Sequence, residues 1–86
     1  LVSNMGTMIK SIHSTQYQML ISWLKDARET QGLTMRDLAK KLEVPHSFIG
    51  KVEQCERRID VIEYMAYCRA LELSPVDGIN LLLNLK

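Results

Sequence analysis

Apolar residues recur along this chain at intervals of three and four positions, which is the spacing of one face of an α-helix. No stretch shows the strict apolar-polar alternation that is typical of a half-buried β-strand. We therefore predict an all-α fold of five short helices. They cover about residues 15–31, 34–43 and 45–54, followed by a helix that opens at Asp60 and a last one that opens at Ser74.

Start and stop signals separate these helices. Three residue pairs fit the capping box, in which two side chains satisfy free backbone N–H groups reciprocally: Thr15 with Gln18, Thr34 with Asp37, and Asp60 with Glu63. Pro45 and Pro75 suit the first turn of a helix, where the missing N–H costs nothing. Gly32 can adopt the left-handed conformation that ends a helix.

The apolar stripes also predict which side chains form the core. In the first four helices these are Tyr17, Leu20, Ile21, Leu24, Ala27, Leu38, Ala39, Leu42, Phe48, Ile49, Val52, Val61, Tyr64, Met65, Cys68 and Leu71. In the last helix, Val76, Ile79 and Leu83 are expected to face the core. That orientation would leave Leu81 and Leu85 on the far side of the helix.

A chain of 86 residues is long enough for one domain with a single core, but near the size at which stability is modest. We expect residues 15–86 to form this domain and residues 1–14 to be an N-terminal extension. The chain begins at Leu1, and Met5 and Met8 are both candidate starts, which leaves open whether the first few residues are native.

The composition is that of an ordinary globular protein, with 47% hydrophobic and 24% charged residues. No apolar run approaches the roughly 18 residues of a membrane span, and no signal peptide is visible, so we expect a cytoplasmic protein without a membrane partner. Two cysteines are too few for a disulfide framework. With His13 and His46 they form no close ligand pair, so no metal or other cofactor is expected.

Charge is unevenly distributed, although the net charge is only +1. Residues 34–58 hold six basic against four acidic side chains, whereas residues 59–86 have a net charge of −2. The basic centre favours one face for an anionic partner and another face for something else.

Patterns that would indicate catalysis are missing from the sequence. There is no glycine-rich phosphate loop, no pair of carboxylates in a plausible cleft, and no nucleophile with a base at motif spacing. We therefore expect neither an enzyme nor a binding site for a small molecule.

The helix predicted at residues 45–54 has two different sides on a helical wheel. Ile49 and Val52, with Phe48 beside them, point one way. The other side is small, polar and singly basic, and consists of His46, Ser47, Gly50, Lys51 and Gln54. Such side chains can bond to base edges, and the preceding short helix and three-residue turn fit a helix-turn-helix. On the wheel alone, an ordinary amphipathic helix with a solvated face is the commoner interpretation.

The segment TMRDLAKKLEVPHSFIGKVEQCERRIDVIEYMAYCRALELSP resembles the XRE/Cro-type, phage-repressor-like helix-turn-helix regulators, with their pattern PQS(Y/F)(V/I)SK(V/I)E-x-GERR(L/I)D. The stretch KSIHSTQYQ resembles the usual beginning of the same subgroup. The likeness runs from about Lys10 to Leu83. It implies a compact five-helix, lambda-repressor-like DNA-binding domain whose second and third helices form the helix-turn-helix.

The resemblance also implies which side chains contact DNA. His46, Ser47 and Lys51 would read bases or nearby phosphates, with Gly50 where the family often has serine; the base that His46 prefers stays open. The remaining implied contacts lie along the phosphate backbone: Thr34 and Met35 at the start of the second helix, and Gln54, Arg57 and Arg58 at the exit of the third. Solvated surface charge is the alternative reading of the two arginines.

Two further features follow from the resemblance. Arg28 and Glu53 match a pair that ties the first helix to the third by an internal salt bridge. Cys55 stands where the family has a glycine with positive φ, which predicts either a strained left-handed cysteine or a reshaped turn. Glu43 poses the same problem at the turn before the third helix.

One short recognition helix contacts too few base pairs for useful selectivity, so a homodimer on two half-sites is expected. Leu81, Leu85 and Ile62 are the candidate interface. The leading hypothesis is a sequence-specific regulator of transcription that binds double-stranded DNA, is encoded by a bacterium, phage or mobile element, and represses by occluding polymerase. The alternative is a protein-interaction module such as an antitoxin-like partner or an adaptor.

Overall fold

The computed structural model describes residues 14–84, and within this range the chain forms helices and no strands. The helices are α2 (Thr15–Thr30), α3 (Met35–Leu42), α4 (His46–Glu53), α5 (Val61–Ala70) and α6 (Pro75–Leu83). The predicted all-α, five-helix fold is confirmed. Leu85 and most of the N-terminal extension lie outside the described residues.

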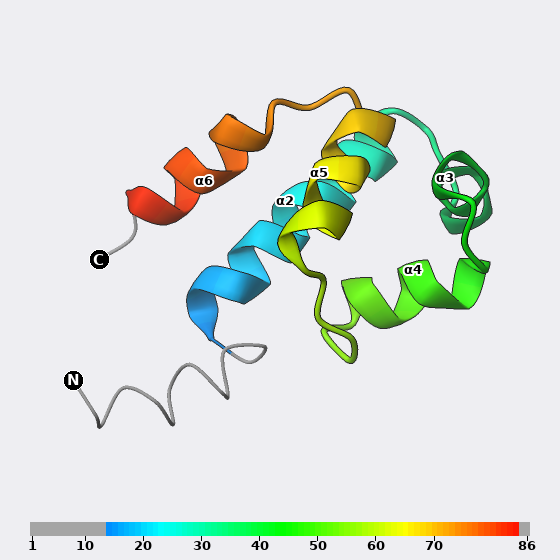
Figure 1. The fold of residues 1–86 in the computed structure, drawn as a ribbon, viewed down its shortest axis with the longest axis horizontal. Coiled ribbons are helices and arrows are strands. Elements are labelled where there is room, and N and C mark those ends of the chain that lie inside the picture. The colour runs from blue at the N-terminus through cyan, green and yellow to red at the C-terminus, as the bar shows by residue number, and fades with distance from the viewer. Residues whose placement is uncertain (1–13, 85–86) are drawn as a thin grey trace.

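In the view of Figure 1, α2 and α5 lie in the middle of the molecule, with α6 toward one side and α3 and α4 toward the other. α3 and α4 pack against each other on one side, where α3 also contacts α5 and α4 contacts α2, while α6 lies along α2 on the other side. The most deeply buried side chains come from α2, α3, α4 and α5 or its C-terminal cap: Leu24, Leu38, Ile49, Val52, Tyr67, Cys68 and Leu71. The core therefore fixes the position of α4 through two of its own residues.

The caps of α3 and α5 are the predicted residues, and the cap of α2 lies one residue before the predicted one. Thr34 with Asp37 forms the capping box of α3, and the corresponding pair of α5 is formed by Asp60 and Glu63. α2 is capped one residue earlier than predicted, by Ser14, whose hydroxyl accepts a hydrogen bond from the Tyr17 N–H at 3.1 Å.

Four helices end in the same backbone motif. In each, a residue with positive φ is followed by one whose N–H bonds to the carbonyl five residues back, as in a Schellman motif; the positive-φ residues are Gly32, Glu43, Cys55 and Glu72. The predicted left-handed Cys55 is therefore present, at φ 59°. Glu43 behaves as the sequence suggested, and Glu72 was missed.

The predicted buried faces of α5 and α6 are partly wrong. On α5, Val61 and Met65 are exposed, and Tyr67 takes their place in the core. The buried face of α5 is Tyr64, Tyr67 and Cys68, because the helix packs against α3 and α6.

On α6 the predicted orientation is reversed. Val76, Ile79 and Leu83 are exposed, by 62%, 46% and 73%. The helix instead turns Gly78 and the half-buried Leu82 toward the core. Leu81 is also half-buried and lines a depression with Trp23 on α2, so it does not lie on a free outer face. The reason is Gly78, which allows α6 to lie close to the Leu20 and Trp23 side chains of α2.

Candidate nucleic-acid interface

The outer face of α4 is built on a buried inner face. Ile49 and Val52 are almost fully buried, with exposed fractions of 0% and 1%, and they fix the rotation of the helix. The side chains on the opposite side are consequently exposed: His46, Ser47, Lys51 and Gln54. The structure thus brings four of the predicted contacts to one surface, which carries donors, acceptors and one positive charge.

Gly50 is the exception on this face, because it is half-buried. A Cβ atom at this position would lie 3.8 Å from the Met35 sulfur, which is ordinary van der Waals contact. Met35, at the start of α3, therefore packs toward α4 and is itself half-buried. Its thioether covers the α3–α4 contact and presents little polar surface to a partner.

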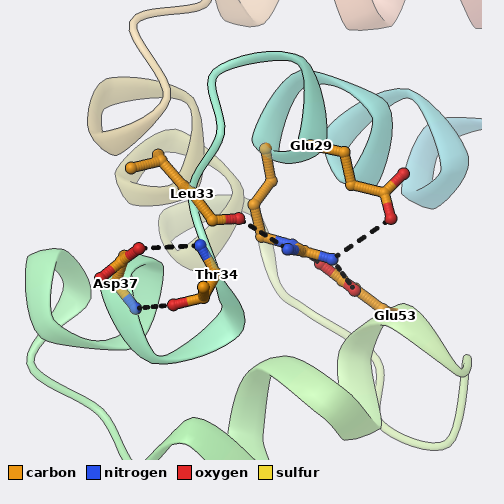
Figure 2. A network of polar contacts seen from close by, with 6 residues as sticks. Glu29, Leu33, Thr34, Asp37 and Glu53 are labelled. Atoms are coloured by element: carbon orange, nitrogen blue, oxygen red, sulfur yellow. Dashed lines mark hydrogen bonds and ion pairs between the residues drawn. The ribbon is translucent and has the colours of Figure 1, made fainter.

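A buried ion pair holds the end of α4 against α2 (Figure 2). The Nε and Nη2 groups of Arg28 donate to the two carboxylate oxygens of Glu53, at 2.7 and 3.0 Å. Nη1 donates to the Leu33 carbonyl at 2.7 Å. The two side chains are only 8% and 4% exposed, and the hydrogen bonds that Arg28 donates to Glu53 raise the pKa of the guanidinium above its usual value. A bidentate pair of this kind fixes geometry more tightly than a single point contact would.

The start of α3 is fixed by its capping box, also drawn in Figure 2. The Thr34 hydroxyl oxygen accepts from the Asp37 N–H at 3.0 Å, and an Asp37 carboxylate oxygen accepts from the Thr34 N–H at 2.9 Å. These bonds lower the pKa of Asp37. Thr34 is exposed, and its hydroxyl proton is still able to donate to an anion.

The exit of α4 has more internal contacts than the sequence indicated. The Arg57 guanidinium lies 4.4 Å from the centre of the Phe48 ring and forms an ion pair with Glu63 at 3.1 Å. The backbone N–H of Ile59 donates to the Tyr17 hydroxyl at 3.2 Å, which attaches the loop to α2. Arg58 is exposed.

Sequence reasoning missed the basic side of α3. Arg36 and Lys40 line an open groove together with Thr34 and His46, at the junction of α3 and α4. The excess of positive charge in residues 34–58 was the available signal, but it did not indicate which cations share a surface with α4. Asp37 and Glu43 also line this groove, so its charge is mixed.

The two cysteines do not form a reactive pair. Burial raises the pKa of both the Cys55 and the Cys68 thiol, which keeps them protonated. Among residues 14–84 no group of three or more histidine, cysteine or acidic side chains could hold a metal ion. None of the described helices has the length and apolarity needed to span a membrane.

Comparisons with known proteins agree with this geometry. The sequence profile of a helix-turn-helix family matches residues 24–77. An XRE-family-like protein from Pseudomonas syringae pv. tomato str. DC3000 has a similar structure, with a TM-score of 0.77 and 41% sequence identity over 87% of this chain and 92% of its own. A comparison with curated protein sequences finds no significant match.

Two more distant structures share the fold. One is the restriction-modification controller protein C.Esp1396I, solved as a tetramer in complex with its natural 35-base-pair operator, with a TM-score of 0.73 and 24% identity over 83% and 93% of the two chains. The other is the clp gene regulator ClgR from C. glutamicum, with a TM-score of 0.72 and 21% identity over 83% and 92%.

Proposed function

Because this chain belongs to the XRE-type helix-turn-helix family of DNA-binding regulators, we propose that it binds a specific duplex DNA sequence as a homodimer, with α4 as the recognition helix in the major groove. Residues 15–86 are the proposed DNA-binding and dimerisation domain. Bound at an operator in the cytoplasm, the dimer would repress transcription by excluding polymerase. A phage or another mobile element is the proposed source.

One observation carries this proposal: the exposed polar face of α4 belongs to a helix whose opposite face is packed into the core. His46, Ser47 and Lys51 project from a helix whose far side is buried and whose end is tied to α2 through Glu53. Base reading needs side chains placed on a rigid element, because each bidentate contact discriminates by only about 1–3 kcal/mol.

The proposed phosphate contacts surround this face. Thr34 stands at the start of α3, while Gln54 and Arg58 stand at the exit of α4. Met35, whose thioether carries no N–H or O–H donor, would add van der Waals contact with a sugar. Groups at such positions fix the register of a protein on the duplex without reading the sequence.

Dimerisation is supported by an apolar surface that α5 and α6 leave exposed. We call it the α5–α6 apolar face; it consists of Val61, Ile62, Met65, Val76, Ile79 and Leu83. The hollow between the two helices is also lined by apolar side chains, including Pro75. Contiguous exposed apolar residues on a small domain mark an interaction site. Ile62, which the sequence predicts at the interface, is exposed on α5 but does not line this hollow, and Leu81 is half-buried.

The same face could instead receive a different protein, as an interaction module would require. The oligomeric state decides between the two partners. Ile79→Glu should convert a dimer to a monomer in sedimentation velocity and weaken operator binding, while Asn80→Glu, at the exposed neighbouring position, should change neither. A wild-type protein that is monomeric at micromolar concentration would favour the interaction module.

Selection of bound sequences from random duplex DNA tests the function. Wild-type protein should enrich two related half-sites about one helical turn apart. Ser47→Ala and Lys51→Ala should each alter the enriched sequence, whereas Lys25→Ala, which removes an exposed lysine from α2, should not. Unchanged selection by the first two variants would refute α4 as the reading helix.

A further inference from the structure

Arg57 is held by three groups of the protein itself. Its guanidinium lies over the face of the Phe48 ring, 4.4 Å from the centre. Its Nη1 and Nη2 atoms donate to the two carboxylate oxygens of Glu63, at 3.3 and 3.1 Å, and Nη1 also donates to the Arg58 carbonyl at 3.0 Å. A planar guanidinium that stacks on a ring and pairs with a carboxylate at its edge uses geometry that lysine cannot reproduce.

The groups that hold Arg57 belong to two different helices. Phe48 is part of α4 and adjoins Ile49, which is completely buried. Glu63 is part of α5, and its Oε1 atom also accepts from the Asp60 N–H at 2.9 Å. Because the capping box already fixes the Glu63 carboxylate, Arg57 attaches α4 to a rigid point at the start of α5.

This arrangement competes with binding of a DNA phosphate. These hydrogen bonds use three of the five N–H donors of the guanidinium, and the Arg57 side chain is 42% exposed. A phosphate at the remaining donors would lie beside the Glu63 carboxylate, and the two anions would repel each other. Arg57 also lowers the pKa of Glu63, so this carboxylate is ionised at neutral pH.

We propose that Arg57 is a positioning residue, which holds Phe48 and with it the recognition helix against the start of α5, and that it does not act as a phosphate contact. This inference rests on the proposed function, because operator binding is its main readout. The proposal gives Arg57 and Arg58 different roles, although the sequence pattern implies a phosphate contact for both. Its effect is on the orientation of the α4 face, and therefore on specificity.

The test compares Arg57→Gln, Arg57→Lys and Glu63→Gln in the full chain, bound to the selected operator and to a scrambled duplex over a series of salt concentrations. A positioning role predicts that each variant loses about tenfold in affinity for the operator relative to the scrambled duplex. The slope of log affinity against log salt should change by less than about 0.5. Arg57→Lys should not restore the lost preference for the operator. Glu63→Gln should lower this preference, as Arg57→Gln does.

A phosphate contact predicts the opposite on each readout. Arg57→Gln would then weaken binding to both duplexes equally and reduce the slope of log affinity against log salt by about 0.9. Arg57→Lys would retain most of the binding. Glu63→Gln would strengthen binding, because it releases the arginine. That set of results would overturn the proposal. Arg58→Gln, which removes the same charge from the next residue, calibrates the slope change of a lost charge at this site.

Failure of the proposed function would be distinguishable from failure of this inference. If wild-type protein prefers no sequence, the function fails, and the positioning contact between Arg57 and Phe48 is then tested by urea unfolding of Arg57→Gln, Phe48→Leu and the double variant. This contact predicts that the two changes are non-additive by about twofold or more in the unfolding equilibrium constant. Additive effects would overturn it.

Discussion

Gly78 in α6 and Gly50 in α4 are both mid-helix glycines, yet alanine should have opposite effects at the two positions. In an exposed helix interior, Gly→Ala stabilises by about 0.8–1 kcal/mol, because alanine loses less backbone entropy on folding. At Gly50 an added methyl would meet only the Met35 sulfur, at 3.8 Å. Gly50→Ala should therefore raise the free energy of unfolding by up to about 1 kcal/mol.

At Gly78 the same methyl has no room. Its Cβ would clash with the Tyr64 hydroxyl and lie 2.8 Å from the Trp23 ring and 3.1 Å from Leu20. Overpacking of this kind costs about 1–3 kcal/mol. The displaced Tyr64 hydroxyl would also lose the hydrogen bond that it donates to the Pro75 carbonyl at 2.6 Å, at a cost of about 1 kcal/mol. When the gain in helix propensity is subtracted, Gly78→Ala should still lower the free energy of unfolding by about 1–3 kcal/mol.

Urea unfolding followed by circular dichroism measures both variants, and the fluorescence of Trp23, the only tryptophan of the chain, reports on the packing at Gly78. A loss of 1 kcal/mol corresponds to a fall of about 4–8 °C in Tm for a domain of this size. If Gly78→Ala were as stable as wild type, with unchanged fluorescence, α6 could not lie on α2 at the described distance. The reversed orientation of α6, and with it the α5–α6 apolar face, would then be wrong.

Three further changes test the supports of the site. Glu53→Ala leaves the buried Arg28 without its carboxylate and should lower the free energy of unfolding by about 3–5 kcal/mol in urea denaturation; a loss below about 1 kcal/mol would contradict the buried pair. Cys55→Gly should stabilise by about 1 kcal/mol, because it removes the left-handed strain, whereas Cys55→Ala, which keeps a Cβ atom, should not. The bonds to Thr34 hold the pKa of Asp37 below its usual value, so its contribution to stability is present above about pH 4 and is lost as the pH falls below that. The stability difference between wild type and Asp37→Asn should thus vanish on acidification, and a difference independent of pH would refute the assignment.

Helix caps and helix starts were predictable because their causes are local. Thr34 with Asp37, and Asp60 with Glu63, satisfy backbone groups within four residues, so no tertiary information is needed to find them. The shift from Thr15 to Ser14 shows the limit of such signals, since both residues can cap and the neighbouring pattern fits either.

The orientation of α6 could not be predicted because this helix is apolar on most sides. Its segment PVDGINLLL offers two nearly equal stripes to a helical wheel, and only the packing of Gly78 against Trp23 selects one. A glycine within an otherwise apolar helix was the available signal of a close approach. Among the described residues, the proposed α5–α6 apolar face shares only Ile62 with the interface predicted from the sequence.

The candidate site shows the same division between local and long-range information. His46, Ser47 and Lys51 were placed on one exposed face by helical periodicity alone. The internal engagement of Arg57 depends on Phe48, nine residues before it, and on Glu63 in the next helix. Spacing in the sequence does not reveal such a contact, which is why the arginine resembled an ordinary phosphate ligand.

The central claim is that α4 reads duplex DNA from the major groove as one half of a dimer. Methylation protection on the selected operator tests it most directly, because dimethyl sulfate modifies guanine N7 in the major groove and adenine N3 in the minor groove. The proposed function predicts that guanine N7 is protected in two patches about one helical turn apart, and that Lys51→Ala reduces the protection in both. Protection of adenine N3 alone, or of a single patch, would contradict it.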